Sequence, residues 1–165
     1  VMDLIKIFEG LSPEIDCKLM MVGEGPEKVK AIEYIENAGL EDKILFLGNS
    51  NEIDKILCYS DLFLLPSEKE SFGLSALEAM AHGVPVISSN AGGISEVNID
   101  GVSGYLADIG DVDTMVVRAK ELLSNDELHS QFKKQAKQQA SKFSLEKIIG
   151  KYETIYSDAV ASIQF

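Results

Sequence analysis

Two glutamates on either side of a glycine turn are the residues of this chain best suited to hold a polar ligand. The segment that begins at Glu70 reads Glu-Ser-Phe-Gly-Leu-Ser-Ala-Leu-Glu. If it is helical throughout, Glu70 and Glu78 lie about 12 Å apart along the helix axis. The backbone N–H groups of Phe72, Gly73 and Leu74 would then be free at the helix start, where phosphate oxygens bind. This arrangement suits the hydroxyl and diphosphate groups of a nucleotide-sugar.

Each glutamate also has a purely structural explanation. Glu70 would be a first-turn carboxylate favoured by the helix dipole, and Glu78 a solvated helix residue. Because short patterns match often by accident, the two glutamates alone favour the structural explanation. The choice between a structural and a ligand-binding role therefore depends on the residues around the two glutamates.

Strand-like and helical segments alternate along the chain around this pair. The expected strands are 18–26, 43–48, 61–65, 84–88 and 104–107. The first of them is expected to be buried and to end in a glycine turn. The expected helices are 1–11, 27–38, 52–60, the segment that follows Glu70, 94–98, 111–123, 126–143 and 144–161. This alternation predicts an α/β fold, with a doubly wound parallel sheet and C-terminal helices. In the last helix, Tyr152, Ile155, Tyr156 and Val160 are expected to pack in the core.

Length and charge limit the classes of function. A chain of 165 residues with 45% hydrophobic residues can form one well-cored domain. Its net charge of -12 argues against nucleic-acid and anionic-membrane partners. No apolar run has the length of a membrane span, and no secretory leader is present, so we expect a cytoplasmic protein. Its only arginine, Arg118, lies in a helix far along the chain from the glutamates.

The cysteines and histidines do not predict a metal site. Cys17 and Cys58 are expected to be free thiols that fill the core. His82 and His129 have no partner at metal-ligand spacing. A role for His82 at the end of the central helix is expected to be structural, because a terminal cation is favoured there.

A Gly-x-Gly turn follows the first expected strand. Gly23 and Gly25 are a weak nucleotide signal, because the dinucleotide fingerprint needs a third glycine where this chain has Lys28. A dinucleotide-dependent dehydrogenase is therefore disfavoured.

The wider context of the glutamates resembles a known family. The matching segments are Pro66-Ser67, Glu70-Ser-Phe-Gly-Leu-Ser-Ala-Leu-Glu78, Gly83-Val-Pro-Val-Ile87 and Gly92-Gly-Ile-Ser-Glu96. They resemble the donor-binding half of retaining glycosyltransferases of the fourth family, which have the two-domain GT-B architecture. The resemblance implies a Rossmann-like domain over residues 1–165 that lacks an N-terminal acceptor domain. The helical pattern that starts at residue 1 without a capping residue agrees with a fragment.

Two shorter segments resemble one branch of this family, which acts in bacillithiol biosynthesis. They are Ser67-Glu-Lys-Glu-Ser-Phe-Gly73 and Gly110-Asp-Val-Asp113. This resemblance implies transfer of N-acetylglucosamine from UDP-N-acetylglucosamine to L-malate, a small hydroxy acid.

The resemblance also implies residue roles. Glu70 would be the catalytic-site residue that holds donor-sugar hydroxyls, and Glu78 would hold the ribose hydroxyls. Sugar and phosphate would meet the segment formed by Ser71, Phe72, Gly73 and Leu74. The nucleotide would lie near Gly23, Gly25, Gly48, Asn49 and Ile53, with the uracil beside the last three.

Such enzymes transfer the sugar without a metal or cofactor, and the UDP-sugar is a substrate. Catalysis then rests on positioning and on stabilisation of the leaving phosphate. The family uses an arginine and a lysine for this purpose, and their segment is absent from residues 1–165, so this chain alone is expected to be inactive. Lys69 is expected to face solvent.

Two alternatives stay open beside the transferase. One is a UDP-sugar epimerase of GT-B fold, and the other is a non-catalytic nucleotide-binding module. Assembly into a homo-oligomer is also left open by the sequence.

Overall fold

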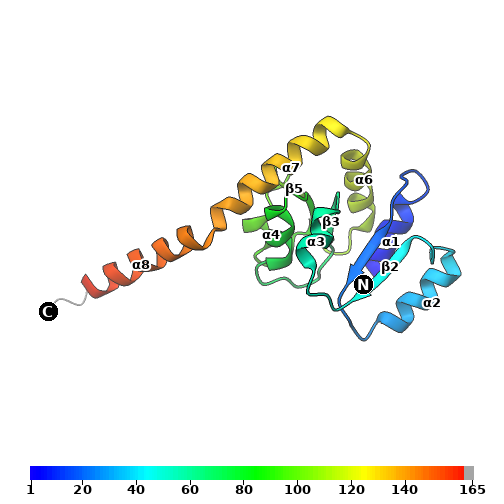
Figure 1. The fold of residues 1–165 in the computed structure, drawn as a ribbon, viewed down its shortest axis with the longest axis horizontal. Helices are drawn as coiled ribbons and strands as arrows, with labels where there is room; N and C mark the ends of the chain where they lie inside the picture. The colour runs from blue at the N-terminus through cyan, green and yellow to red at the C-terminus, as the bar shows by residue number, and fades with distance from the viewer. Residues whose placement is uncertain (162–165) are drawn as a thin grey trace.

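The computed structural model describes residues 1–161, and it has α/β architecture in which three α-helices follow the last strand (Figure 1). The predicted α/β class with parallel strands and C-terminal helices is confirmed. The last four residues of the predicted domain 1–165 lie outside the described residues.

The strands form two parallel sheets, where the sequence predicts one. The smaller sheet pairs β1 (Leu19–Val22) with β2 (Ile44–Gly48). The larger sheet has the order β3 (Phe63–Leu65), β4 (Val86–Ser89), β5 (Gly104–Ala107). One edge of β1 and one edge of β3 are therefore free of strand partners among the described residues.

The helices follow the predicted order, with shorter bounds at several ends. They are α1 (Met2–Leu11), α2 (Lys28–Ala38), α3 (Ile53–Cys58), α4 (Leu74–Ala81), α5 (Ile94–Val97), α6 (Val112–Leu123), α7 (Asp126–Ala140), the 3-10 turn η1 (Ser141–Phe143) and α8 (Leu145–Ala161). Side-chain caps set two of these starts. Asp111 accepts a hydrogen bond from the Thr114 N–H, and Asn125 accepts one from the Leu128 N–H.

Helix α1 connects the two halves of the fold. Its Ile5 and Phe8 pack in a cluster with α2 and the β1–β2 sheet. Its Ile7 and Leu11 pack in a second cluster with β4, β5 and α6. One helix therefore spans the gap between the two sheets.

The larger sheet forms the best-buried part of the molecule. Every residue of β4 is buried, as expected for a central parallel strand that is covered on both faces. The Asn98 amide, which is fully buried, ties β4 to β5 because its Nδ2 donates to the backbone oxygens of Val86 and Tyr105. Helix α4 covers one face through Ala76, Ala79 and Met80.

The smaller sheet is less covered. The sequence predicts that the first strand is buried, but none of its residues is buried, so this expectation is wrong. In β2, Leu45 and Leu47 are 41% and 40% exposed. The physical reason is that helices α1 and α2 cover only part of this sheet.

The C-terminal helix differs most from its prediction. Tyr152, Ile155, Tyr156 and Val160 were expected in the core, but all four are exposed and no residue of α8 is buried. Figure 1 shows why, because α8 extends away from the rest of the molecule. Within residues 1–161, no helix combines the length and hydrophobicity needed to cross a bilayer.

Candidate functional site

The loop before α4 folds back on the helix start. Helix α4 begins at Leu74, after Gly73 with a left-handed φ of 91°, so Glu70 is not helical. Its Oε1 accepts hydrogen bonds from the N–H groups of Gly73 at 3.0 Å and Phe72 at 3.4 Å. The predicted free N–H groups of Phe72 and Gly73 are therefore wrong, because the Glu70 carboxylate satisfies them. Only Leu74 retains the position of a first helical N–H.

Two glycines hold this loop in place from the start of α5. The Gly93 N–H donates to the Glu70 carbonyl at 3.3 Å. A Cβ on Gly92 would lie 1.8 Å from the Glu70 carbonyl oxygen, and one on Gly93 would lie 2.5 Å from the oxygen of Ser71. The close backbone approach therefore requires glycine at both positions. The two loops form one unit at the carboxyl ends of β3 and β4, the edge where parallel sheets bind ligands.

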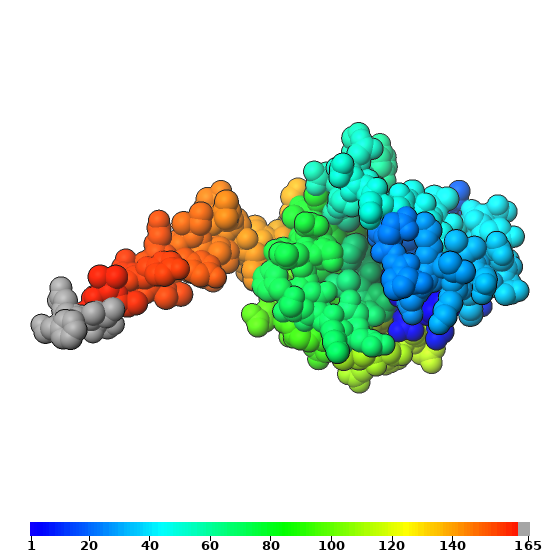
Figure 2. All heavy atoms as spheres, turned by 90° about the horizontal axis from the view of Figure 1, so that it is seen from below, coloured from blue at the N-terminus to red at the C-terminus, as the bar shows by residue number. Residues whose placement is uncertain are grey.

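Glu78 lies one turn into α4 and lines a cavity of about 1090 Å³. Ser75 lines the same cavity, because residues three apart share a helix face. Both side chains are exposed, so the carboxylate of Glu78 is accessible to a ligand. Figure 2 shows the surface hollowed between the blue N-terminal part and the green central part of the chain.

The cavity brings together four of the predicted site residues. Gly23, Gly25, Ile53 and Glu78 all line it, although they come from three different parts of the sequence. Gly48 lies beside this group, because its carbonyl accepts the Gly23 N–H at 2.8 Å. The predicted nucleotide loops and the predicted ribose glutamate are therefore neighbours in space.

The other predicted residues do not line this cavity in the described part of the chain. They are Asn49, Glu70, Ser71, Phe72, Gly73 and Leu74. The predicted site thus consists of two adjoining parts, the cavity with Glu78 and the loop with Glu70, joined through α4. The individual roles predicted for these residues stay predictions.

Lys28 is a cavity residue that the sequence reasoning used only to reject a dinucleotide site. It is the first residue of α2, and its Nζ binds the Glu24 carboxylate at 2.9 Å and lies 5.9 Å from the centre of the Phe46 ring. In the sequence, its place about one helical turn after the Gly23–Gly25 turn could have indicated a cation beside the predicted nucleotide loops. It gives the cavity one cation near the predicted nucleotide loops.

Cys17 also lines the cavity, at the end opposite Gly23. Burial raises the pKa of its thiol, with Asp16 acting in the same direction and Lys43 partly opposing it. Both cysteines are free thiols as predicted, but Cys58 is exposed, so its predicted core position is wrong. It ends the short helix α3, which turns it toward solvent.

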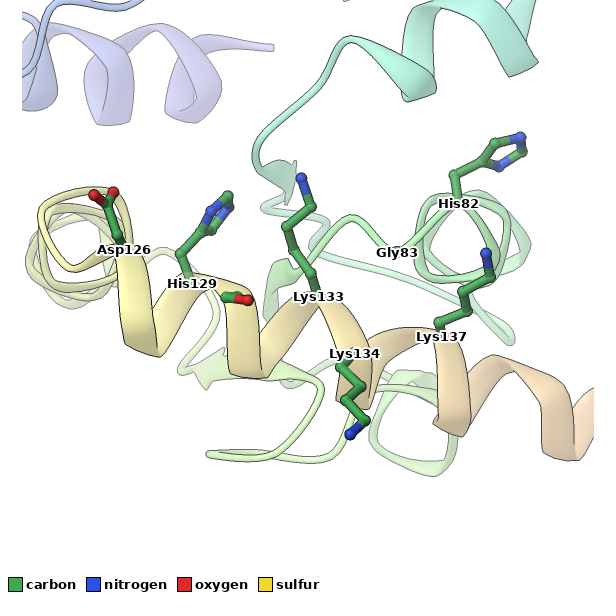
Figure 3. A pocket seen from close by; sticks show the side chains of 8 residues that line it. His82, Gly83, Asp126, His129, Lys133, Lys134 and Lys137 are labelled. Carbon is green, nitrogen blue, oxygen red and sulfur yellow. The ribbon is translucent and has the colours of Figure 1, made fainter.

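A second depression is basic and lies along α7 (Figure 3). Figure 3 shows Lys133 and Lys137 on the side of α7 that faces His82, while Lys134 points away. His82 caps α4, its Nδ1 lying 3.0 Å from the Glu78 carbonyl, which agrees with the predicted structural role. The His129 Nε2 lies 2.7 Å from the Asp61 carbonyl. Both imidazoles are thus engaged by backbone, and the depression shares no predicted site residue.

Comparisons with known proteins identify the family of this chain. The model of the family "Glycosyl transferases group 1" matches residues 1–139. N-acetyl-alpha-D-glucosaminyl L-malate synthase from Bacillus anthracis is 44% identical over 161 residues, which are 97% of this chain and 42% of that protein. 2-Deoxystreptamine N-acetyl-D-glucosaminyltransferase from Niallia circulans is 31% identical over 151 residues, 90% of this chain and 39% of that protein.

A solved structure shares the fold. HepE from Anabaena in complex with UDP-glucose is 28% identical, with a TM-score of 0.83, over 94% of this chain and 44% of that chain. This chain therefore spans less than half the length of these relatives. The match covers both sheets and the loops at their carboxyl ends. The chain belongs to the glycosyl transferases group 1 family, and its fold is that of a GT-B glycosyltransferase domain.

Proposed function

We propose that residues 1–165 are the donor-binding domain of a retaining, metal-independent UDP-sugar glycosyltransferase of the cytoplasm. The observation that carries this proposal is the cavity that Glu78 shares with Gly23, Gly25 and Ile53, three residues of the loops predicted to hold a nucleotide. A carboxylate accepts hydrogen bonds from the two hydroxyls of a ribose, and glycine turns admit a close approach of base and phosphate.

For the full-length protein, we propose N-acetylglucosamine transfer from UDP-N-acetylglucosamine to L-malate. The support is the 44% identity to the Bacillus anthracis synthase, which is named for the product N-acetyl-alpha-D-glucosaminyl L-malate. The Glu70 loop would bind the donor sugar, and the Glu70 side chain would exchange its contact with the Gly73 N–H for sugar hydroxyls. An acceptor site would belong to polypeptide beyond this chain.

Binding of UDP tests the assignment of Glu78. We expect calorimetry to detect weak UDP binding by the chain, because Lys28 is one of few cations at the cavity. Glu78→Ala should abolish the binding, since the ribose would lose its acceptor. Glu96→Ala removes another exposed carboxylate, outside the cavity, and should bind UDP as the parent does. Equal UDP affinity in the parent and in Glu78→Ala would overturn the ribose assignment.

The Glu70 assignment needs a variant that keeps the loop folded. Glu70→Gln retains an oxygen that can accept the Gly73 N–H, while it removes the charge. We expect unchanged UDP affinity and a lost preference for UDP-N-acetylglucosamine over UDP. A preference retained in Glu70→Gln and in Glu70→Ala would assign the sugar contact to other residues.

A transfer assay of the full-length protein tests the reaction itself. A panel of UDP-sugars and hydroxy acids, with and without EDTA, should give transfer with UDP-N-acetylglucosamine and L-malate and no effect of EDTA. A product that remains linked to UDP would instead identify an epimerase, and UDP binding without turnover would identify a binding module.

A further inference from the structure

An aromatic ring from the corner between α7 and α8 packs against the Glu70 loop. We propose that this ring, which belongs to Phe143 in η1, positions the loop for the donor sugar. It fixes Phe72, which lies between Glu70 and the start of α4, and it does not touch the sugar itself. This role rests on the proposed binding of sugar by the Glu70 loop.

The first observation is the geometry of the contact between the two rings. The centroids of the Phe72 and Phe143 rings lie 5.8 Å apart, and the ring planes meet at 74°. The positive edge of one ring therefore meets the negative face of the other, which is one of the two arrangements that aromatic pairs prefer. A leucine at position 143 would fill part of the same volume, but it would not favour one orientation of the Phe72 ring.

The second observation is the place of Phe72 in the loop. The Phe72 N–H and the Gly73 N–H both donate to Oε1 of Glu70, at 3.4 and 3.0 Å. A change in the φ or ψ angle of Phe72 turns at least one of these donors away from the carboxylate, because the two N–H groups flank its Cα. A fixed Phe72 ring thus holds the Glu70 carboxylate in one position.

The corner that carries Phe143 is itself tied to α5. Gln139, near the end of α7, is buried, and its Nε2 donates a long hydrogen bond of 3.5 Å to the Glu96 carbonyl in α5. The Gln139 Oε1 accepts a hydrogen bond of 2.7 Å from Nζ of Lys142, the residue before Phe143. Both ends of the buried amide are therefore engaged, as buried polar groups require. The turn η1 is thus held in place relative to α5, the helix whose start also contacts the Glu70 loop.

Phe143 supports a part of the loop that the glycines of α5 do not reach. The glycine contacts involve the backbone carbonyls of Glu70 and Ser71. Phe143 instead contacts the side chain of Phe72. Loss of the Phe143 ring therefore leaves the glycine contacts in place and frees Phe72. We expect a loop that stays folded but holds its carboxylate less firmly.

Ordinary core packing is the alternative to a positioning role. Phe72 and Phe143 both pack against the buried cluster around α4, so the loss of either ring also lowers stability. Phe132 in α7 separates the two explanations. It is 2% exposed, and its ring lies 5.1 Å from that of Tyr105 in the cluster with α1 and α6, away from the Glu70 loop. Phe132→Leu therefore removes a better-buried ring from the same helical region without changing the contact with Phe72.

Hydrogen exchange of single amides, measured without ligand, tests the effect on the loop. Phe143→Leu should speed exchange of the Phe72 and Gly73 amides by about tenfold, because loop amides exchange by local opening. Phe132→Leu should leave both amides unchanged, although it should speed exchange of the Ile87 amide, which requires opening of the larger sheet. Phe143→Tyr keeps the ring and should restore slow exchange at both loop amides.

Calorimetry with UDP and UDP-N-acetylglucosamine tests the effect on the donor sugar. Phe143→Leu should reduce the preference for UDP-N-acetylglucosamine over UDP by about fivefold, the size expected for one aromatic contact, and it should leave the affinity for UDP unchanged. Phe143→Tyr and Phe132→Leu should both keep the preference of the parent chain.

The outcomes separate this role from the proposed function. Unchanged exchange at Phe72 and Gly73 in Phe143→Leu, or a preference that Phe143→Leu retains, would overturn the positioning role and leave the proposed sugar site standing. A preference lost equally in Phe132→Leu would assign the effect to general destabilisation, and would also overturn it. A parent chain that binds UDP but does not prefer UDP-N-acetylglucosamine would overturn the sugar site and the positioning role together.

Discussion

The two sheets of this domain contain similar strands but differ in how they are covered. Each residue of β4 is buried between α4 and the cluster of α1, α6 and α7 residues, whereas β1 has no buried residue. The four residues of β1 are all apolar and those of β4 are half serine, yet only β4, which has two strand neighbours and two helical layers, is fully buried. The comparison shows that burial is a property of the position in the sheet as well as of the sequence.

The comparison also separates the two parts of the candidate site. The Glu70 loop lies on the well-packed half, where Gly92 and Gly93 fix it by backbone contact. The loops with Gly23 and Gly48, which we propose to hold the nucleotide, lie on the less covered half. We therefore expect the Glu70 loop to be more rigid than the loops with Gly23 and Gly48.

The largest difference should appear when one apolar side chain is shortened in each sheet. Ile87→Ala in β4 should lower the free energy of unfolding by about 4 kcal/mol, because the side chain is fully buried and leaves a cavity. Leu45→Ala in β2 should cost less than about 1 kcal/mol, because 41% of that residue is exposed. Urea unfolding measures both.

Equal costs in the two variants would contradict the difference in cover between the sheets.

The next prediction tests whether the Glu70 loop depends on the contact with Gly92. Gly92→Ala places a Cβ against the Glu70 carbonyl and strains a φ of +57°. We expect a loss of about 2 kcal/mol or more in the free energy of unfolding and weaker binding of UDP-N-acetylglucosamine. Denaturant unfolding and calorimetry measure these two effects.

Gly110→Ala is the matched control for backbone strain. Gly110 has a φ of +80°, but no atom lies within 4 Å of the position its Cβ would take. This variant should lose only about 1 kcal/mol and keep its ligand preference. If the two variants lose the same stability and neither changes ligand preference, the glycine contact does not position the loop.

The sequence predicted the order of elements well because their signals are local. Alternating apolar segments and helical periodicity located the strands and most helices, and the context around Glu70 and Glu78 identified the family. The errors involve partners distant in sequence. Burial of β1 depends on what lies along its free edge, and burial of Tyr152 depends on whether any element packs on α8. Neither condition can be read from periodicity.

For the candidate site, the sequence located the helix with Glu78 and the turn at Gly73 before it, while the functional roles of these residues stay predictions. The hydrogen bond from the Gly73 N–H to Glu70 depends on a loop reversal that no residue spacing specifies. The cavity contact of Lys28 depends on two loops that are brought together by the Gly23–Gly48 hydrogen bond. Contacts between loops that are distant in sequence can be identified only once the fold is known.

The smallest predicted effect concerns the reactivity of the two thiols. It tests how well Cys17, at the start of the less covered sheet, is shielded from solvent, and it requires no change in stability. Cys58 is exposed on α3, whereas Cys17 is half-buried just before β1, and burial raises the pKa of Cys17. A raised pKa leaves less thiolate at a given pH, so alkylation of Cys17 should be slower and should increase at a higher pH than for an ordinary thiol. Mass spectrometry after iodoacetamide treatment between about pH 7 and 10 measures this, with Cys17→Ser and Cys58→Ser assigning the sites. A Cys17 that reacts as fast as Cys58 would contradict the difference in burial between the two thiols.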